Sequence, residues 1–229
     1  MKWVLLPGFM GVADDWRAFA EALSGHGSIS PSVLCAPYSG LPEREPFWLC
    51  GYSMGGRVAI SLAQSPGCRG VISISSSPGL CGDRERSARA EADEQIAARL
   101  ERLRNEAEFR EFLNEWWSQP VFRGSTLTPG QREQLIQSRL SLDPRELAAH
   151  LRAFGPAAMP PLWEQWNTLA IPKLAIAGER DPKYAALARE MGEHRILANC
   201  GHQVPLEQPA ALAAGVLAWR QSLPPEEPV

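Results

Sequence analysis

Short apolar runs recur along the chain and predict the strands of a buried sheet. Runs that stay apolar at successive positions, instead of alternating with polar residues, are typical of strands covered on both faces of a parallel sheet. The predicted strands are residues 3–6, 31–35, 47–50, 71–75, 173–177 and 195–198.

Amphipathic stretches separate these runs and predict helices. The helical pattern covers residues 16–23, 57–63, 184–191 and 209–223. Strands that alternate with helices in this order favour an α/β fold, in which helices flank a mainly parallel sheet.

The pattern changes in the middle of the chain. From about residue 81 to residue 152 the sequence is charged, rich in Ala, Leu, Glu and Arg, and helical in period, with no strand candidate. The prolines at 156, 160 and 161 end this stretch, and the α/β pattern then resumes. We therefore expect a core of residues 1–80 and 161–223, a helical cap of residues 81–160 inserted before the last two strands, and a disordered tail of residues 224–229.

Composition and charge exclude several classes of protein. The formal net charge is −3, so no overall basic field favours nucleic acid or an anionic membrane as a partner. The five cysteines are scattered and form no C-x-x-C pair, which favours reduced thiols over a zinc site or a disulfide framework. The apolar run at the N-terminus is too short for a signal peptide, and no stretch is long enough to span a membrane. We expect a cytoplasmic protein.

The predicted strand 47–50 leads into Gly51-Tyr-Ser-Met-Gly55, and a helical stretch follows. A strand, a sharp turn between glycines and a helix, with serine in the turn, is the pattern of a nucleophile elbow. The glycines are expected because this strained turn brings backbone against backbone and leaves no room for Cβ atoms. Ser53 is therefore the candidate for a reactive hydroxyl at the top of the sheet.

A serine hydroxyl needs a histidine to take its proton and an acid to orient that histidine. In elbow enzymes the acid and then the histidine follow the serine along the chain, each beyond the end of a strand. Asp181 follows the strand 173–177, and His202 follows the strand 195–198. Taken singly, Asp181 is explained as a turn residue before a proline and His202 as a structural loop residue. Together with Ser53 they predict a catalytic triad.

Stabilising an oxyanion beside such a serine requires two backbone N–H donors. They come from the residue after the nucleophile and from the loop after the first strand, which are Met54 and Phe9 in this chain. A core aromatic residue in a tight turn is the alternative interpretation of Phe9, and the two interpretations are compatible.

Arginines and tryptophans beyond the triad are candidates for substrate contacts. Arg57 lies one helical turn after Ser53 and is expected near it. Most arginines of the predicted cap should pair with neighbouring glutamates on solvated helix faces, while a few facing the elbow would bind carboxylates bidentately. Trp116 and Trp117 are explained most simply by packing inside the cap, and an aromatic side chain could also line a pocket.

Several segments of the chain carry a family resemblance. They are Gly51-Tyr-Ser-Met-Gly-Gly-Arg57, Trp117-Ser-Gln-Pro-Val-Phe122, Pro161-Leu-Trp163, Gly178-Glu-Arg-Asp-Pro-Lys-Tyr184 and Gly201-His202. With these segments the chain resembles the 2-succinyl-6-hydroxy-2,4-cyclohexadiene-1-carboxylate synthases of menaquinone and phylloquinone synthesis. The resemblance covers essentially the whole chain. Its most specific parts are Arg57 after the double glycine and the W-x-Q-P-V-F block, which other enzymes with the same triad do not share as a rule.

The resemblance implies an α/β-hydrolase fold with a helical lid and a cofactor-free lyase. In this family the triad serine acts as a base, and 2,5-elimination expels pyruvate from a small substrate with several carboxylates. The implied site residues are Ser53, Asp181 and His202 for the triad, Phe9 and Met54 for the oxyanion hole, Arg57, Arg89 and Arg139 for the carboxylates, and Tyr52 with Trp116 or Trp117 for the pocket wall.

The chain departs from the family pattern at one place. The family usually has His-Gly before the position of Phe9, and this chain has Pro7-Gly8. A carboxylesterase or thioesterase with the same triad is the alternative function, and a non-catalytic binding protein of the same fold is a third. We expect no nucleic-acid or membrane partner and a monomeric protein, although the sequence itself carries no signal of oligomeric state.

Overall fold

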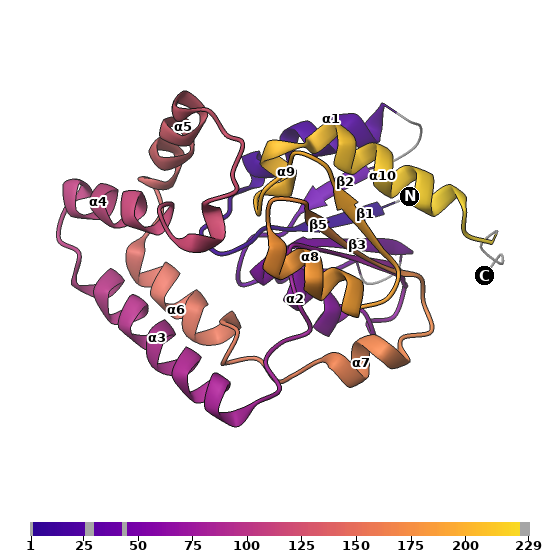
Figure 1. Ribbon diagram of the computed structural model, residues 1–229, viewed down its shortest axis with the longest axis horizontal. Helices are drawn as coiled ribbons and strands as arrows, with labels where there is room; N and C mark the ends of the chain where they lie inside the picture. Colours follow the sequence, from indigo (N-terminus) through magenta and orange to yellow (C-terminus); the bar gives the residue numbers. More distant parts are fainter. Residues whose placement is uncertain (1, 26–29, 43–44, 225–229) are drawn as a thin grey trace.

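The computed structural model describes residues 2–25, 30–42 and 45–224 and contains a parallel sheet in the order β2-β1-β3-β4-β5-β6 (Figure 1). Each neighbouring pair of strands in this sheet is parallel. The predicted α/β fold is confirmed. The strands are β1 (Lys2–Leu6), β2 (Ser30–Val33), β3 (Phe47–Tyr52), β4 (Cys68–Ile74), β5 (Lys173–Gly178) and β6 (His194–Leu197).

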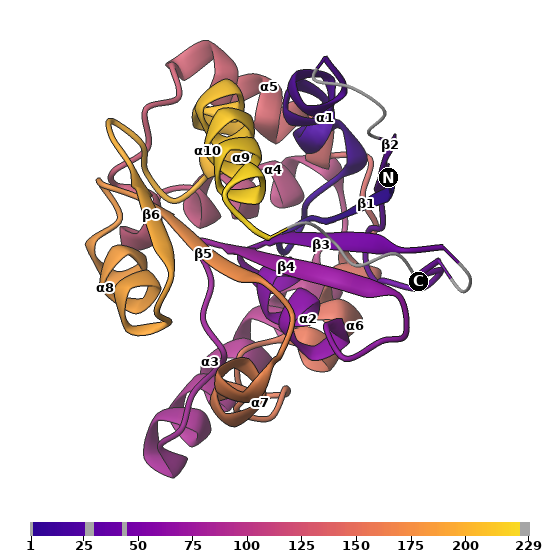
Figure 2. The same cartoon turned by 90° about the vertical axis from the view of Figure 1, so that its right-hand side faces the viewer.

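Helices cover both faces of the sheet, and this explains the unbroken apolar runs. In β1, Val4 and Leu6 point into one buried cluster while Trp3 and Leu5 point into another. The first cluster includes residues of three helices: α2 (Met54–Leu62), α7 (Trp163–Thr168) and α8 (Pro182–Glu190). The second cluster includes residues of three others: α1 (Arg17–Ser24), α9 (Val204–Glu207) and α10 (Pro209–Gln221). The two sets of helices lie on opposite sides of the sheet in Figure 2. Both faces of a strand must then be apolar.

The helices α1, α2, α8 and α10 cover the predicted helical stretches, although α2 begins at Met54, before its predicted start at residue 57. The sequence pattern does not predict the short helices α7 and α9. The predicted helix 16–23 is preceded by a 3-10 turn, η1 (Ala13–Trp16). The helix α8 begins at Pro182 because Asp181 caps it and proline suits the first helical position.

Between β4 and α7 the chain forms a separate group of helices. They are α3 (Asp83–Arg102), α4 (Glu106–Trp116), η2 (Pro120–Phe122), α5 (Pro129–Arg139) and α6 (Pro144–Phe154). They lie to one side of the sheet (Figure 1) and share their own buried cluster, which includes Leu100, Phe112 and Ile136. The side chain of Met10, from the loop after β1, is buried in the same cluster.

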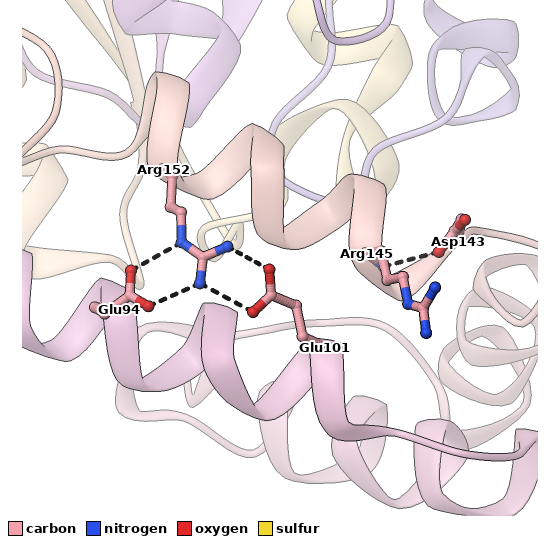
Figure 3. Close-up of polar contacts among 5 residues, drawn as sticks. All are labelled: Glu94, Glu101, Asp143, Arg145 and Arg152. Carbon is pink, nitrogen blue, oxygen red and sulfur yellow. Dashed lines mark hydrogen bonds and ion pairs between the residues drawn. The ribbon is translucent and has the colours of Figure 1, made fainter.

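Charged side chains on the outside of this group pair with one another. Arg152 of α6 reaches Glu94 and Glu101 of α3, and Figure 3 shows the guanidinium between the two carboxylates. The hydrogen bonds to both carboxylates raise the pKa of Arg152 above its ordinary value. Arg99 pairs with Glu115, and Arg110 pairs with Glu133. Other arginines of this group have different partners: Arg86 donates to the carbonyls of Met159 and Ala157, and Arg89 pairs with Asp93. The expectation that most of these arginines meet glutamates therefore holds for only some of them.

The remaining differences from the predicted elements are small. The strand expected at 31–35 spans Ser30–Val33, and the strand expected at 195–198 spans His194–Leu197. Of the tail expected at 224–229, residues 225–229 lie outside the described residues. Within the described ranges, the model contains no helix with both the length and the apolar character needed to cross a bilayer.

Candidate active site

Ser53 sits in a strained turn between β3 and α2. Its backbone has φ 52° and ψ −115°, a conformation that a residue with a side chain rarely adopts. Two contacts hold it there: the Ser53 N–H donates to the carbonyl of Ile74 at 2.8 Å, and the Ser76 hydroxyl donates to the Ser53 carbonyl at 2.6 Å. Strain of this kind persists only where the surroundings impose it.

The glycines on either side of the turn are required by close backbone contacts. A Cβ atom on Gly51 would lie 2.2 Å from the carbonyl oxygen of Gly55. A Cβ atom on Gly55 would lie 2.2 Å from the carbonyl oxygen of Leu6. The helix α2 can therefore approach β1 and β3 only if both positions are glycine, as the elbow pattern predicts.

The structure brings Ser53, His202 and Asp181 together. His202 Nε2 lies 3.3 Å from Ser53 Oγ, and His202 Nδ1 lies 2.6 Å from Asp181 Oδ2. The carboxylate can only accept, so Nδ1 carries the proton in this pair and Nε2 is left to accept the serine proton. His202 and Asp181 are buried, which strengthens both hydrogen bonds.

Aromatic rings enclose the imidazole of His202. The ring centroids of Tyr52, Tyr184 and Phe122 lie 5.5, 4.8 and 5.7 Å from that of His202. Burial raises the pKa of Tyr52 well above its ordinary value and also raises that of Tyr184, so both phenols stay protonated. The described hydrogen bonds of the two ring nitrogens of His202 go to Ser53 and Asp181.

Phe9 and Met54 both lie at the elbow, where the oxyanion hole was predicted. Met54 is the first residue of α2, so its N–H has no acceptor within the helix. The loop after β1 touches the turn, since a Cβ atom on Gly8 would lie 3.2 Å from Ser53 Cβ. The Phe9 ring packs edge-on against Trp116 with centroids 5.1 Å apart.

A small chamber of about 40 Å³ lies over Ser53. A space of this size holds no more than a few water molecules. Both Trp116 and Trp117 contribute to its wall, together with Tyr52, Phe9, Phe122, Arg139 and Gln203. The sequence left open which tryptophan faces the pocket, and in the structure both do.

Arg57 is buried in an unusual environment. Only 4% of its surface is exposed, and its Nε and Nη1 atoms have no hydrogen-bond partner among the described residues. Burial lowers the pKa of its guanidinium, and the nearby charge of Arg89 lowers it further. The Asp93 carboxylate lies near enough to oppose this lowering, but among the described residues no hydrogen bond or ion pair joins it to Arg57. A buried cation without a direct partner is energetically costly, and the arrangement suits a site that receives an anion.

The three predicted substrate arginines are divided between two cavities. Arg57 and Arg89 line a second cavity of about 660 Å³, while Arg139 lines the chamber over Ser53. Arg89 Nε donates to Asp93 Oδ1 at 2.8 Å, and the buried Arg139 pairs with Asp15. The side chain of Tyr184 lines the larger cavity and also packs on His202.

Sequence patterns missed three residues at the site. Asp15 pairs with Arg139 over 124 residues of chain, and no local pattern predicts such a contact. Gln203 is buried and lines the chamber, which its position directly after His202 could have suggested. Glu207 accepts hydrogen bonds from the loop that carries His202. Within the part of the chain that the structure describes, no three His, Cys, Asp or Glu side chains gather as a metal site requires.

Comparison with known proteins agrees with the fold. The model of the alpha/beta hydrolase family matches residues 3–215. The 2-succinyl-6-hydroxy-2,4-cyclohexadiene-1-carboxylate synthases of Salmonella paratyphi C and Salmonella agona are 40% and 34% identical to this chain. Each alignment covers 91% of this chain and 89% of the relative.

A solved structure shares the same architecture. The structure of MenH from S. aureus has a TM-score of 0.85 and 24% sequence identity, and the alignment covers 96% of this chain and 93% of that one. The chain thus belongs to the α/β hydrolase family and, within it, to the family of 2-succinyl-6-hydroxy-2,4-cyclohexadiene-1-carboxylate synthases.

Proposed function

We propose that this protein is a lyase of menaquinone or phylloquinone synthesis. It converts 2-succinyl-5-enolpyruvyl-6-hydroxy-3-cyclohexene-1-carboxylate to 2-succinyl-6-hydroxy-2,4-cyclohexadiene-1-carboxylate and pyruvate. The observation that carries this proposal is the buried, unpartnered guanidinium of Arg57, one helical turn after Ser53. An esterase that acts on neutral esters has no use for such a cation, whereas a substrate with several carboxylates does.

The reaction begins with proton transfer from Ser53 to His202. The Nε2 atom of His202 accepts the hydroxyl proton, and Asp181 stabilises the imidazolium through Nδ1. The serine alkoxide then removes the substrate proton next to the succinyl ketone. The N–H groups of Phe9 and Met54 stabilise the negative charge that develops on the ketone oxygen.

Elimination completes the reaction without a covalent enzyme intermediate. The electron pair of the broken C–H bond moves through the ring double bond, and the C–O bond to the enolpyruvyl group breaks. The leaving enolate takes the proton from the His202 imidazolium and becomes pyruvate. Ser53 has regained its proton from the substrate, so both residues return to their starting states.

The carboxylates of the substrate are held by Arg57, Arg89 and Arg139, and the rings of Tyr52, Trp116 and Trp117 form the apolar walls. We assign residues 81–160 as a cap over a core of residues 1–80 and 161–223. A chamber of about 40 Å³ over Ser53 is too small for this substrate. The cap must therefore move before the substrate can reach the serine.

The protein is proposed to work in the cytoplasm as a monomer, with its small polycarboxylate substrate as partner. Its cysteines support a reducing compartment, because all five are free thiols and Cys50, Cys68 and Cys200 are buried.

Release of pyruvate by the purified protein tests the proposal. Wild-type protein should release pyruvate from the enolpyruvyl substrate, which a lactate dehydrogenase coupled assay measures. Ser53→Ala should lose at least roughly a thousandfold in kcat, because the variant lacks the oxygen that is proposed to remove the substrate proton. Arg57→Ala should mainly raise KM.

Hydrolysis of p-nitrophenyl esters is the matched control. The Ser53, His202 and Asp181 geometry also suits a carboxylesterase or thioesterase, which is the alternative function. Brisk ester hydrolysis without pyruvate release would establish that alternative. A protein that binds the substrate but neither releases pyruvate nor hydrolyses esters, and whose Ser53→Ala variant binds equally well, would be a binding protein.

A further inference from the structure

The carboxylate of Glu207 lies at the junction between the His202 loop and the cap. Its Oε2 accepts the N–H of Gly201 at 2.7 Å, and its Oε1 accepts the N–H of Gln203 at 3.0 Å. These two amides flank His202 in the chain. Oε2 also accepts the N–H and the hydroxyl of Thr126, each at 2.9 Å, from the loop between η2 and α5.

The two loops also touch backbone to backbone. A Cβ atom on Gly124 would lie 2.1 Å from the carbonyl oxygen of Arg180, which directly precedes Asp181. A Cβ atom on Gly201 would lie 2.7 Å from the carbonyl group of Gly124. The cap segment 122–126 therefore rests directly on the loops that follow β5 and β6 and carry the acid and the histidine of the proposed triad.

Two side-chain contacts extend this junction to the imidazole itself. The Phe122 ring packs edge-on against His202 with centroids 5.7 Å apart. The Ser125 hydroxyl donates to the side-chain carbonyl of Gln203 at 3.4 Å. The segment that Glu207 holds therefore contacts His202 through Phe122 and contacts the next residue, Gln203, through Ser125.

We propose that Glu207 is a positioning residue that fixes His202 by holding the cap segment 122–126 on the His202 loop. This inference rests on the proposed catalytic role of His202. One carboxylate satisfies four donors from two segments, and hydrogen bonds to a charged acceptor are about twice as strong as neutral ones. The segment 122–126 stays on the core, and motion that admits substrate takes place elsewhere in the cap.

The variant Glu207→Gln tests this role with little change in side-chain size. A carboxamide offers one acceptor oxygen, and its NH₂ group would face a backbone N–H where Oε1 now accepts. Glu179→Gln is the matched control. The Glu179 carboxylate also accepts a backbone N–H near His202, from Asn199 at 3.0 Å, but it is exposed and its recorded bond does not reach the cap.

Two measurements report on the position of His202 and do not depend on catalytic turnover. Amide exchange in segments 122–126 and 199–203 should accelerate roughly tenfold or more in Glu207→Gln, because about 1.4 kcal/mol of lost local stability gives a tenfold rise in opening. The low-field proton resonance of the His202–Asp181 hydrogen bond should broaden. Both should match wild type in Glu179→Gln.

Kinetics provide the third readout. In Glu207→Gln, kcat should fall roughly tenfold to a hundredfold while KM changes less than roughly threefold, since misplacing a catalytic group costs rate rather than ground-state binding. If Glu207→Gln does not fold, Thr126→Val removes only the hydroxyl donor and should accelerate exchange at 199–203 by a smaller factor.

The outcomes are distinguishable. The positioning role would be overturned if amide exchange and the low-field proton resonance in Glu207→Gln were the same as in wild type. It would also be overturned if amide exchange at residues 199–203 did not change in Thr126→Val. A fall in kcat that Glu179→Gln reproduces would also overturn it. If wild-type protein releases no pyruvate while exchange and the resonance respond as expected, the proposed function fails and the placement of His202 by Glu207 stands.

Discussion

Arg57 is a buried cation that no described side chain pairs with directly, although the Asp93 carboxylate lies near enough to act on its charge. Its Nε and Nη1 atoms are buried without partners among the described residues, and burial lowers the pKa of the guanidinium. The folded state carries this cost whether or not substrate is bound, so the residue opposes stability while it serves binding. Such a conflict between stability and function is typical of residues that contact substrate.

Replacing Arg57 with methionine should therefore stabilise the protein. Methionine fills a similar space without a charge, and exchanging a buried charge for an apolar side chain commonly gains about 1–4 kcal/mol. Chemical denaturation should show a higher free energy of unfolding, while KM rises roughly tenfold to a hundredfold because charged hydrogen bonds to a carboxylate are lost.

Arg152→Met is the control for this change, since Arg152 is an exposed arginine paired with Glu94 and Glu101 (Figure 3). It should leave KM as in wild type. An Arg57→Met protein that unfolds more easily than wild type and keeps its KM would contradict this account of Arg57.

At the scale of elements, the loop between η2 and α5 illustrates how closely the cap and the core can approach. The carbonyl of Arg180 occupies the space where a side chain on Gly124 would begin. Near the start of α5, Gly130 has no atom within 4 Å of its would-be Cβ. Packing therefore requires glycine at position 124, whereas packing does not require it at position 130.

The pair Gly124→Ala and Gly130→Ala should separate these cases. Gly124→Ala should lower the free energy of unfolding by about 1–3 kcal/mol, because overpacking pushes the cap loop off the Arg180 carbonyl. Gly130→Ala should raise it by about 0.5–1 kcal/mol, because alanine suits a helix better than glycine.

Urea denaturation measures both changes, and pyruvate release should fall in Gly124→Ala alone. Equal effects of the two substitutions would show that the close contact at Gly124 contributes nothing to stability or to the site.

Over the whole molecule, the sequence predicts the strands and the longer helices around the sheet but not the contacts between distant segments. The apolar runs identify every described strand of the sheet because both faces of that sheet are covered. Ser53, Asp181 and His202 could be found since parallel strands bring their carboxyl ends to one edge. The pairing of Arg139 with Asp15 and the four bonds of Glu207 depend on how the cap docks, which no periodicity encodes.

The size of the chamber also bears on turnover. With about 40 Å³ over Ser53, each cycle requires the cap to open and close around a substrate much larger than that space. If this motion limits the rate, kcat should fall in proportion to solvent viscosity when sucrose is added. A slow variant such as Arg57→Lys, limited by chemistry, should show little dependence.

Glycerol at matched viscosity should give the same slope as sucrose, which excludes a specific effect of either additive. A wild-type kcat independent of viscosity in both would mean that the chemical step, not the cap, sets the rate.

The strand order has a consequence for the protein during its synthesis. Ser53 follows β3, in the middle of the sheet, but His202 follows β6, an edge strand that pairs only with β5 among the described strands. The ribosome therefore makes the reactive serine 149 residues before the histidine that activates it. A nascent chain can form its elbow early and remain chemically inert until His202 has been made and β6 has joined the sheet.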